Sequence, residues 1–82
     1  MRKNEKKARN KVIAIAVLDG QTLSSVAKQY GITVERVRQI TAYVCRQANR
    51  DRFEYGQGVI WMRKHRAEFW DAIQQLPIDF NQ

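Results

Sequence analysis

The sequence contains a single cysteine, Cys45, among its 82 residues. One cysteine excludes a disulfide framework within the chain and is typical of a reducing compartment, so we expect a cytoplasmic protein. No apolar run approaches the roughly 18 residues that a membrane span needs. The apolar run at 12–18 follows a basic stretch, but it is too short for a signal peptide and no cleavage site follows it. We therefore expect an intact chain that makes no contact with a membrane.

The residue patterns of enzymes and metal sites are also missing. His65 has no second ligand nearby, and Glu68, Asp71 and Asp79 lack the spacing of a metal-binding set. No nucleophile–base pair, phosphate-binding loop or zinc pattern occurs. We expect no enzymatic activity, no cofactor and no metal. We interpret His65 as a surface or boundary residue and Cys45 as a buried structural thiol.

Positive charge is abundant and unevenly distributed. The net charge is +7 and the isoelectric point is about 10.1. Residues 1–11 carry +5 and residues 28–52 carry +4, whereas residues 12–27 and 53–82 each carry −1. Such a balance favours an anionic partner, which means DNA, RNA, an acidic protein or an anionic membrane surface.

Hydrophobic periodicity predicts an all-α domain of about four helices. We expect residues 1–10 to form a basic N-terminal arm, either a frayed helical start or disordered, with or without a contact to DNA. Residues 11–52 are predicted to form a helix-turn-helix core, and a C-terminal helix within residues 53–82 is predicted to complete the same domain. The expected helices span 11–18, 23–30, 34–50 and 59–76, with a loop at 51–58.

The stretch at 22–50 has the residue spacing of a helix-turn-helix. Thr22 and Thr33 are suitable N-caps for two successive helices. Ala27 supplies the small residue that a close helix crossing requires, and Gly31 supplies the left-handed backbone of the turn. Apolar residues occupy the positions that fill the space between the helices, namely Val26, Tyr30, Ile32, Val37 and Ile40.

The helix predicted at 34–50 has one apolar and one polar face, and side-chain chemistry suggests roles for the polar one. Arg38 can bond both acceptors of guanine, Gln39 can do the same with adenine, and Glu35 can accept from cytosine, so these three are the candidate base readers. Basic side chains and hydroxyls at helix starts suit phosphates. The candidate phosphate contacts are Thr22, Ser24, Lys28, Thr33, Arg36, Arg46 and Arg50.

The segment TLSSVAKQYGITVERVRQI, at 22–40, resembles the DNA-binding half of region 4 of the sigma-70 family of transcription factors. The resemblance covers about residues 12–50, and it implies that the helix after Thr33 enters the major groove of a promoter element and contacts activators. Val34 stands where the family usually has an arginine that helps to read a base. The turn after Leu18 also resembles that of small plasmid or phage repressors of the KorA/TrfB group.

These patterns predict a sequence-specific double-stranded DNA-binding protein that acts in transcriptional regulation. The alternative is a phage- or plasmid-type interaction module that binds RNA polymerase or a sigma factor and redirects transcription. Trp61 lies off the apolar stripe of the last predicted helix, so it is either a core residue or an exposed aromatic at a dimer or polymerase contact. RNA polymerase and a second copy of the chain therefore stay open as partners.

Overall fold

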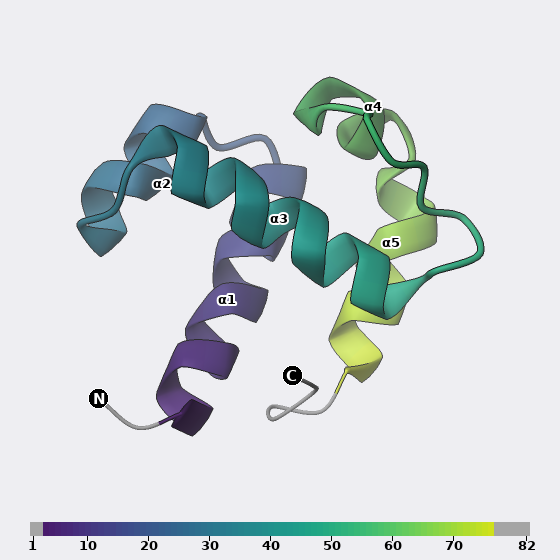
Figure 1. The fold of residues 1–82 in the computed structure, drawn as a ribbon, viewed down its shortest axis with the longest axis horizontal. Helices are drawn as coiled ribbons and strands as arrows, with labels where there is room; N and C mark the ends of the chain where they lie inside the picture. Colours follow the sequence, from purple (N-terminus) through teal and green to yellow (C-terminus); the bar gives the residue numbers. More distant parts are fainter. Residues whose placement is uncertain (1–2, 77–82) are drawn as a thin grey trace.

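The computed structural model describes residues 3–76, with side chains from residue 9 onward. The described part of the chain is helical and contains no strand, which confirms the predicted all-α class. Its helices, shown in Figure 1, are α1 (Lys3–Leu18), α2 (Leu23–Tyr30), α3 (Val34–Ala48), α4 (Val59–Lys64) and α5 (Arg66–Gln75).

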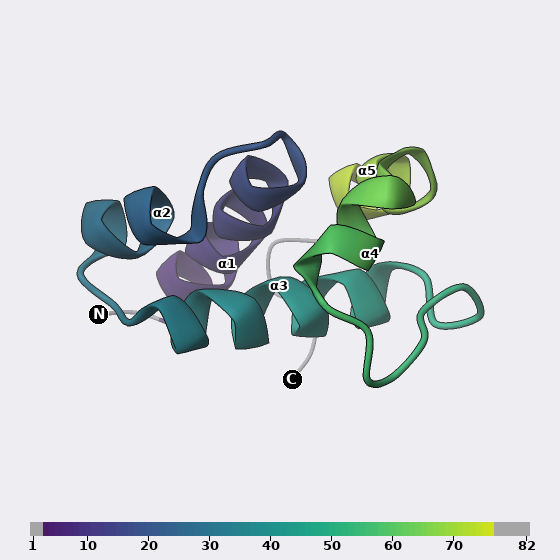
Figure 2. The same ribbon diagram turned by 90° about the horizontal axis from the view of Figure 1, so that it is seen from above.

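Helix α3 organises the arrangement because it contacts each of the other four helices. Figure 2 shows α1, α2 and α5 lying on one side of α3, which leaves the opposite side of its first half uncovered. The core forms between α3 and the helices on its covered side. Its largest fully buried side chains are Ile13, Val17, Val26, Val37, Thr41, Val44, Cys45, Phe69 and Ile73.

Cys45 and Thr41 are the two polar side chains of α3 in this core. Burial raises the pKa of the Cys45 thiol to about 12, which keeps it protonated and unreactive. The Thr41 hydroxyl donates to the Val37 carbonyl at 2.8 Å, so its burial leaves no unpaired donor. The interpretation of Cys45 as a buried structural thiol agrees with this environment.

Threonine side chains cap the N-termini of both α2 and α3, and a glycine ends α2. The Thr22 hydroxyl accepts a hydrogen bond from the Ser25 backbone at 3.1 Å, and the Thr33 hydroxyl accepts one from the Arg36 backbone at 3.0 Å. Gly31 lies in the left-handed region at φ 66°, ψ 36°. The Ile32 N–H then reaches back to the Ala27 carbonyl at 3.0 Å, which closes the C-terminus of α2. The structure therefore has the caps and the glycine turn that the sequence predicts.

Helix α1 begins at Lys3, eight residues before the helix predicted from residue 11, so residues 3–10 adopt the helical start that was one of the two alternatives for the basic arm. The added residues are mostly Lys, Glu, Ala and Arg, which favour helices and extend an existing helix without a new nucleation cost. Hydrophobic periodicity cannot reveal this extension of α1, because the added residues form no apolar face. Later in the same helix, the Lys11 ammonium donates to the Leu76 carbonyl at 2.6 Å and ties α1 to the end of α5.

The single helix predicted at 59–76 is wrong, because the chain breaks at His65 into α4 and α5. The His65 backbone leaves the helical region at φ −105°, ψ 26°. Two arginines hold the segments on either side through long-range contacts. Arg63 of α4 donates to the carbonyls of Val17 and Gln21 at 2.9 and 2.6 Å, and Arg66 of α5 pairs with Asp19 at 3.2 Å. These contacts with the end of α1 are tertiary, so local periodicity does not report them.

Trp61 is half-buried and packs near Phe69, with ring centroids 5.8 Å apart. The exposed apolar side chain of α4 is instead Ile60, which is 75% exposed. Within residues 3–76, no helix has the length and apolar character needed to cross a membrane.

Substitution of Gly31 by alanine tests the turn that joins α2 to α3. A Cβ at Gly31 would meet no atom within 4 Å, so the cost is the left-handed backbone itself, about 1–2 kcal/mol. We expect Gly31→Ala to lower the free energy of urea unfolding by about that amount. Gly58→Ala is the matched control, because its site is also open but its backbone is extended at φ −96°. The control should stay within about 0.5 kcal/mol of the wild type, and equal losses in both variants would contradict the role of the turn.

Candidate DNA interface

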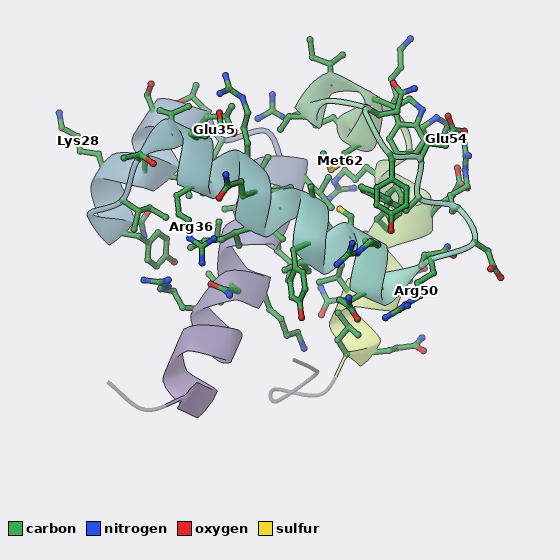
Figure 3. The ribbon with its side chains drawn as sticks, in the orientation of Figure 1. Lys28, Glu35, Arg36, Arg50, Glu54 and Met62 are labelled. Atoms are coloured by element: carbon green, nitrogen blue, oxygen red, sulfur yellow. The ribbon has the colours of Figure 1, made fainter. Side chains whose placement is uncertain are left out.

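The uncovered side of α3 presents a ridge formed by Glu35, Gln39, Ala42 and Arg46, which lie three or four residues apart and so share one face. Glu35 borders a groove of about 210 Å³ shared with α4. Arg36 borders another, of about 350 Å³, beside Asn10 of α1. Figure 3 shows these two side chains at opposite edges of α3. Gln39 lines both grooves and therefore stands at the middle of the exposed surface.

The three candidate base readers lie together on the first half of α3. The Arg38 guanidinium pairs with the Glu35 carboxylate at 3.0 Å, and both side chains are more than half exposed. The Arg36 guanidinium donates to the Gln39 amide oxygen at 3.5 Å. Exposed pairs of this kind contribute little to stability, so these side chains can exchange their partners for base edges at low cost.

The candidate phosphate contacts are distributed over α2, α3 and the residues that follow α3. Ser24 and Lys28 are exposed on α2, and the hydroxyls of Thr22 and Thr33 cap helices but keep their own protons for donation. Figure 3 shows Lys28 and Arg50 at opposite ends of the molecule.

Arg50 lies outside the recognition helix, because α3 ends at Ala48 and not at residue 50 as predicted. Its guanidinium donates to Gln47 at 3.1 Å. Arg46 stays on the helix but is partly covered, since it lies 5.7 Å from the Tyr43 ring and 5.8 Å from the Tyr55 ring. Sequence reasoning missed these tyrosines. For Tyr55 the signal available was the aromatic and glycine content of the segment at 51–58, which was interpreted only as a loop.

The segment between α3 and α4, residues 49–58, is held in place by Arg52. This side chain hydrogen-bonds to Glu68 of α5, pairs with Glu54 at 3.5 Å and lies 5.3 Å from the Trp61 ring. It also contacts both ring nitrogens of His65, at 2.7 and 3.1 Å. When His65 carries its proton on Nδ1, that nitrogen donates to Glu68 at 2.9 Å and Nε2 accepts from Arg52. His65 therefore has a structural role at the boundary, as its solitary position in the sequence suggests.

The Glu68 carboxylate makes this network sensitive to pH. The hydrogen bond from His65, followed by that from Arg52, holds the pKa of Glu68 below its usual value of 4.5. A lowered pKa in the folded state stabilises the fold above the unfolded pKa, and this contribution is lost as the pH falls through the folded pKa.

We expect Glu68→Gln to lower Tm at pH 7, where the wild-type carboxylate is ionised. The difference between wild type and variant should shrink below about pH 4.5, as the wild-type carboxyl takes up its proton. Thermal unfolding followed by circular dichroism from pH 7 to pH 3 measures this difference. A constant difference across the range would contradict the account.

The geometry defines a helix-turn-helix protein whose second helix, α3, has an uncovered polar side. A model of the family described as "Sigma-70, region 4" matches residues 5–47, just over half of the chain. The chain therefore belongs to the sigma-70 region 4 family, which consists of DNA-binding helix-turn-helix regions that act in transcription and are not enzymes. Comparisons with curated proteins and with solved structures find no match.

The family match covers most of α1, all of α2 and nearly all of α3. The segment at 49–58, α4 and α5 lie beyond it. Among the side chains that the structure describes, no group of three or more His, Cys, Asp and Glu residues could hold a metal ion.

Proposed function

We propose that this protein binds double-stranded DNA sequence-specifically and regulates transcription, with α3 in the major groove. The observation that carries the proposal is the uncovered polar side of α3 in a chain of the sigma-70 region 4 family. A helix with its side chains is about 10–12 Å across and the major groove is about 12 Å wide, so a helix free on one side fits it. In helix-turn-helix proteins the N-terminal part of the second helix contacts base edges.

The exposed side chains suggest how the contacts are divided. Arg38 is assigned to guanine, Gln39 to adenine and Glu35 to cytosine, because their donors and acceptors match those base edges. The starts of α2 and α3 supply backbone N–H groups, and the capping hydroxyls of Thr22 and Thr33 keep a proton to donate, which suits phosphate contacts. The remaining phosphate contacts are assigned to Ser24, Lys28, Arg36, Arg46 and Arg50.

A second candidate function is binding to RNA polymerase or to a sigma factor. The supporting observation is the exposed Ile60 of α4, which borders a groove of about 580 Å³ together with Leu23. This groove also includes Arg38, so a protein bound there would compete with DNA for that side chain. If the partner is RNA polymerase or a sigma factor, we expect its binding to this protein to persist at a salt concentration where contacts to DNA have weakened.

Titration against a labelled mixed-sequence duplex at 50 and 200 mM salt tests the DNA proposal. Counterion release makes the affinity of a protein that neutralises several phosphates fall steeply with salt. Absence of binding at low salt would refute DNA binding.

Variants separate the two kinds of contact on a duplex selected for tight binding. Arg38→Ala and Gln39→Ala should each reduce the preference over mixed-sequence DNA by about 1–3 kcal/mol. Arg46→Ala should weaken all sequences alike and reduce the salt slope by about 1. Gln74→Glu on α5 changes the net charge by the same amount as Arg46→Ala and serves as its control. Equal effects of base-reader and phosphate variants on preference would show that the assigned roles are wrong.

A further inference from the structure

Residues 49–58, here called the flanking loop, stand beside the recognition helix. Figure 2 shows the loop between α3 and α4 projecting past α3 on the side opposite α1 and α2. The loop therefore shares the face on which the first half of α3 is uncovered. The family match ends at residue 47, so the loop lies outside the matched region.

The flanking loop has a defined position because aromatic and charged contacts anchor it. The Phe53 ring meets the rings of Tyr55 and Trp61 edge-on, with centroids 5.3 and 6.4 Å away. The Arg52 N–H donates to the Asn49 side chain at 3.3 Å, and the Arg52 guanidinium binds Glu68. The contacts of Arg52 and Phe53 hold the flanking loop against α4 and α5. They therefore place the loop without a bound ligand.

Grooves separate the flanking loop from the ridge of α3. One of about 330 Å³ lies between Gln39 and Arg46 on the helix side and Tyr55 and Gln57 on the loop side. Gln57 also borders the two grooves that contain Arg38. The loop tip therefore lies next to the side chains assigned to base reading but is separated from them by a gap.

The dimensions of DNA determine what such a neighbour can touch. A helix with its side chains already fills the width of the major groove. An element that stands beside the helix on its DNA-facing side cannot enter the same groove. It must lie over the sugar–phosphate backbone that borders the groove.

The chemistry of the loop tip suits a phosphate. Tyr55 is 74% exposed, and its hydroxyl accepts from Arg46 at 3.3 Å while retaining a proton to donate. Gln57 carries an amide donor between Gly56 and Gly58, whose lack of side chains allows close backbone approach. The flanking loop contains two acidic residues, of which Glu54 is paired with Arg52 and Asp51 is exposed beside the basic Arg50.

We propose that the flanking loop is a second DNA-contacting element, in which Tyr55 and Gln57, together with Arg46 of α3, bind the phosphate backbone at the edge of the groove occupied by α3. This inference rests on the proposed DNA-binding function and extends it beyond the helix-turn-helix. The loop limits how far the second half of α3 enters the groove, so the first half reads bases and the loop fixes the register.

Charge substitutions at Gln57 test the proposal without disturbing the fold, since this side chain is exposed. The experiment measures binding to a mixed-sequence duplex between 50 and 200 mM salt for the full chain and its variants. We expect Gln57→Lys to steepen the salt slope by about 0.9 and to tighten binding roughly three-fold. Gln57→Glu should weaken binding by a similar factor. Gln74→Lys and Gln74→Glu place the same charges on α5, away from the proposed face, and should change both quantities much less.

Equal effects at residues 57 and 74, with wild-type binding intact, would overturn the loop contact and leave the recognition-helix function standing. Absence of wild-type binding at low salt would overturn both. Thermal unfolding of each variant confirms that the compared proteins are equally folded. Tyr55→Phe supplies a second readout, because it keeps the edge-on ring contact with Phe53 and removes the hydroxyl together with the hydrogen bond that it accepts from Arg46. It should weaken binding at every salt concentration, whereas unchanged binding would exclude a phosphate contact from that hydroxyl.

Discussion

The packing of α3 on α1 is the constraint on which the rest of the structure depends. Val37, Ile40 and Val44 lie on one face of α3 and are buried in the core that it shares with α1. Burial of this face fixes the rotation of α3 about its axis, because turning the helix would expose apolar area that is costly to hydrate. The polar ridge through Gln39 is thereby directed outward. The same residues that stabilise the fold thus determine which side chains meet a partner.

The remaining elements determine which parts of α3 are covered and which stay exposed. Gly31 and the two threonine caps place α2 across the first half of α3, in the arrangement by which a helix-turn-helix contacts DNA. Helices α4 and α5 cover the second half, where Phe69 and Ile73 complete the core. An 82-residue chain has little apolar surface to bury, so this cover contributes a substantial part of the stability. It also positions the segment that links α3 to α4 beside the outer side of the helix.

The sequence predicted α2, the turn and the start of α3 correctly, because the signals that determine them act between residues close together in the chain. The caps at Thr22 and Thr33, the left-handed Gly31 and the apolar spacing from Val26 to Ile40 all operate within a few residues. Other features depend on contacts between distant segments. Arg63 reaches the end of α1 and Arg52 reaches His65 and Glu68, and these contacts accompany the break at His65 and the placement of residues 49–58. The exposed positions of Glu35, Arg38 and Gln39 followed from periodicity, whereas the tyrosines beside Arg46 did not.

Chemical-shift mapping tests the central claim most directly, that the uncovered side of α3 is the DNA-binding surface. The uniformly ¹⁵N-labelled chain is titrated with a mixed-sequence duplex, and the change at each backbone amide is recorded. The account predicts that the largest changes fall at the N-termini of α2 and α3 and along the first half of α3, with α5 nearly unaffected. Changes centred on Ile60 and α4, with the amides of α3 unmoved, would contradict it.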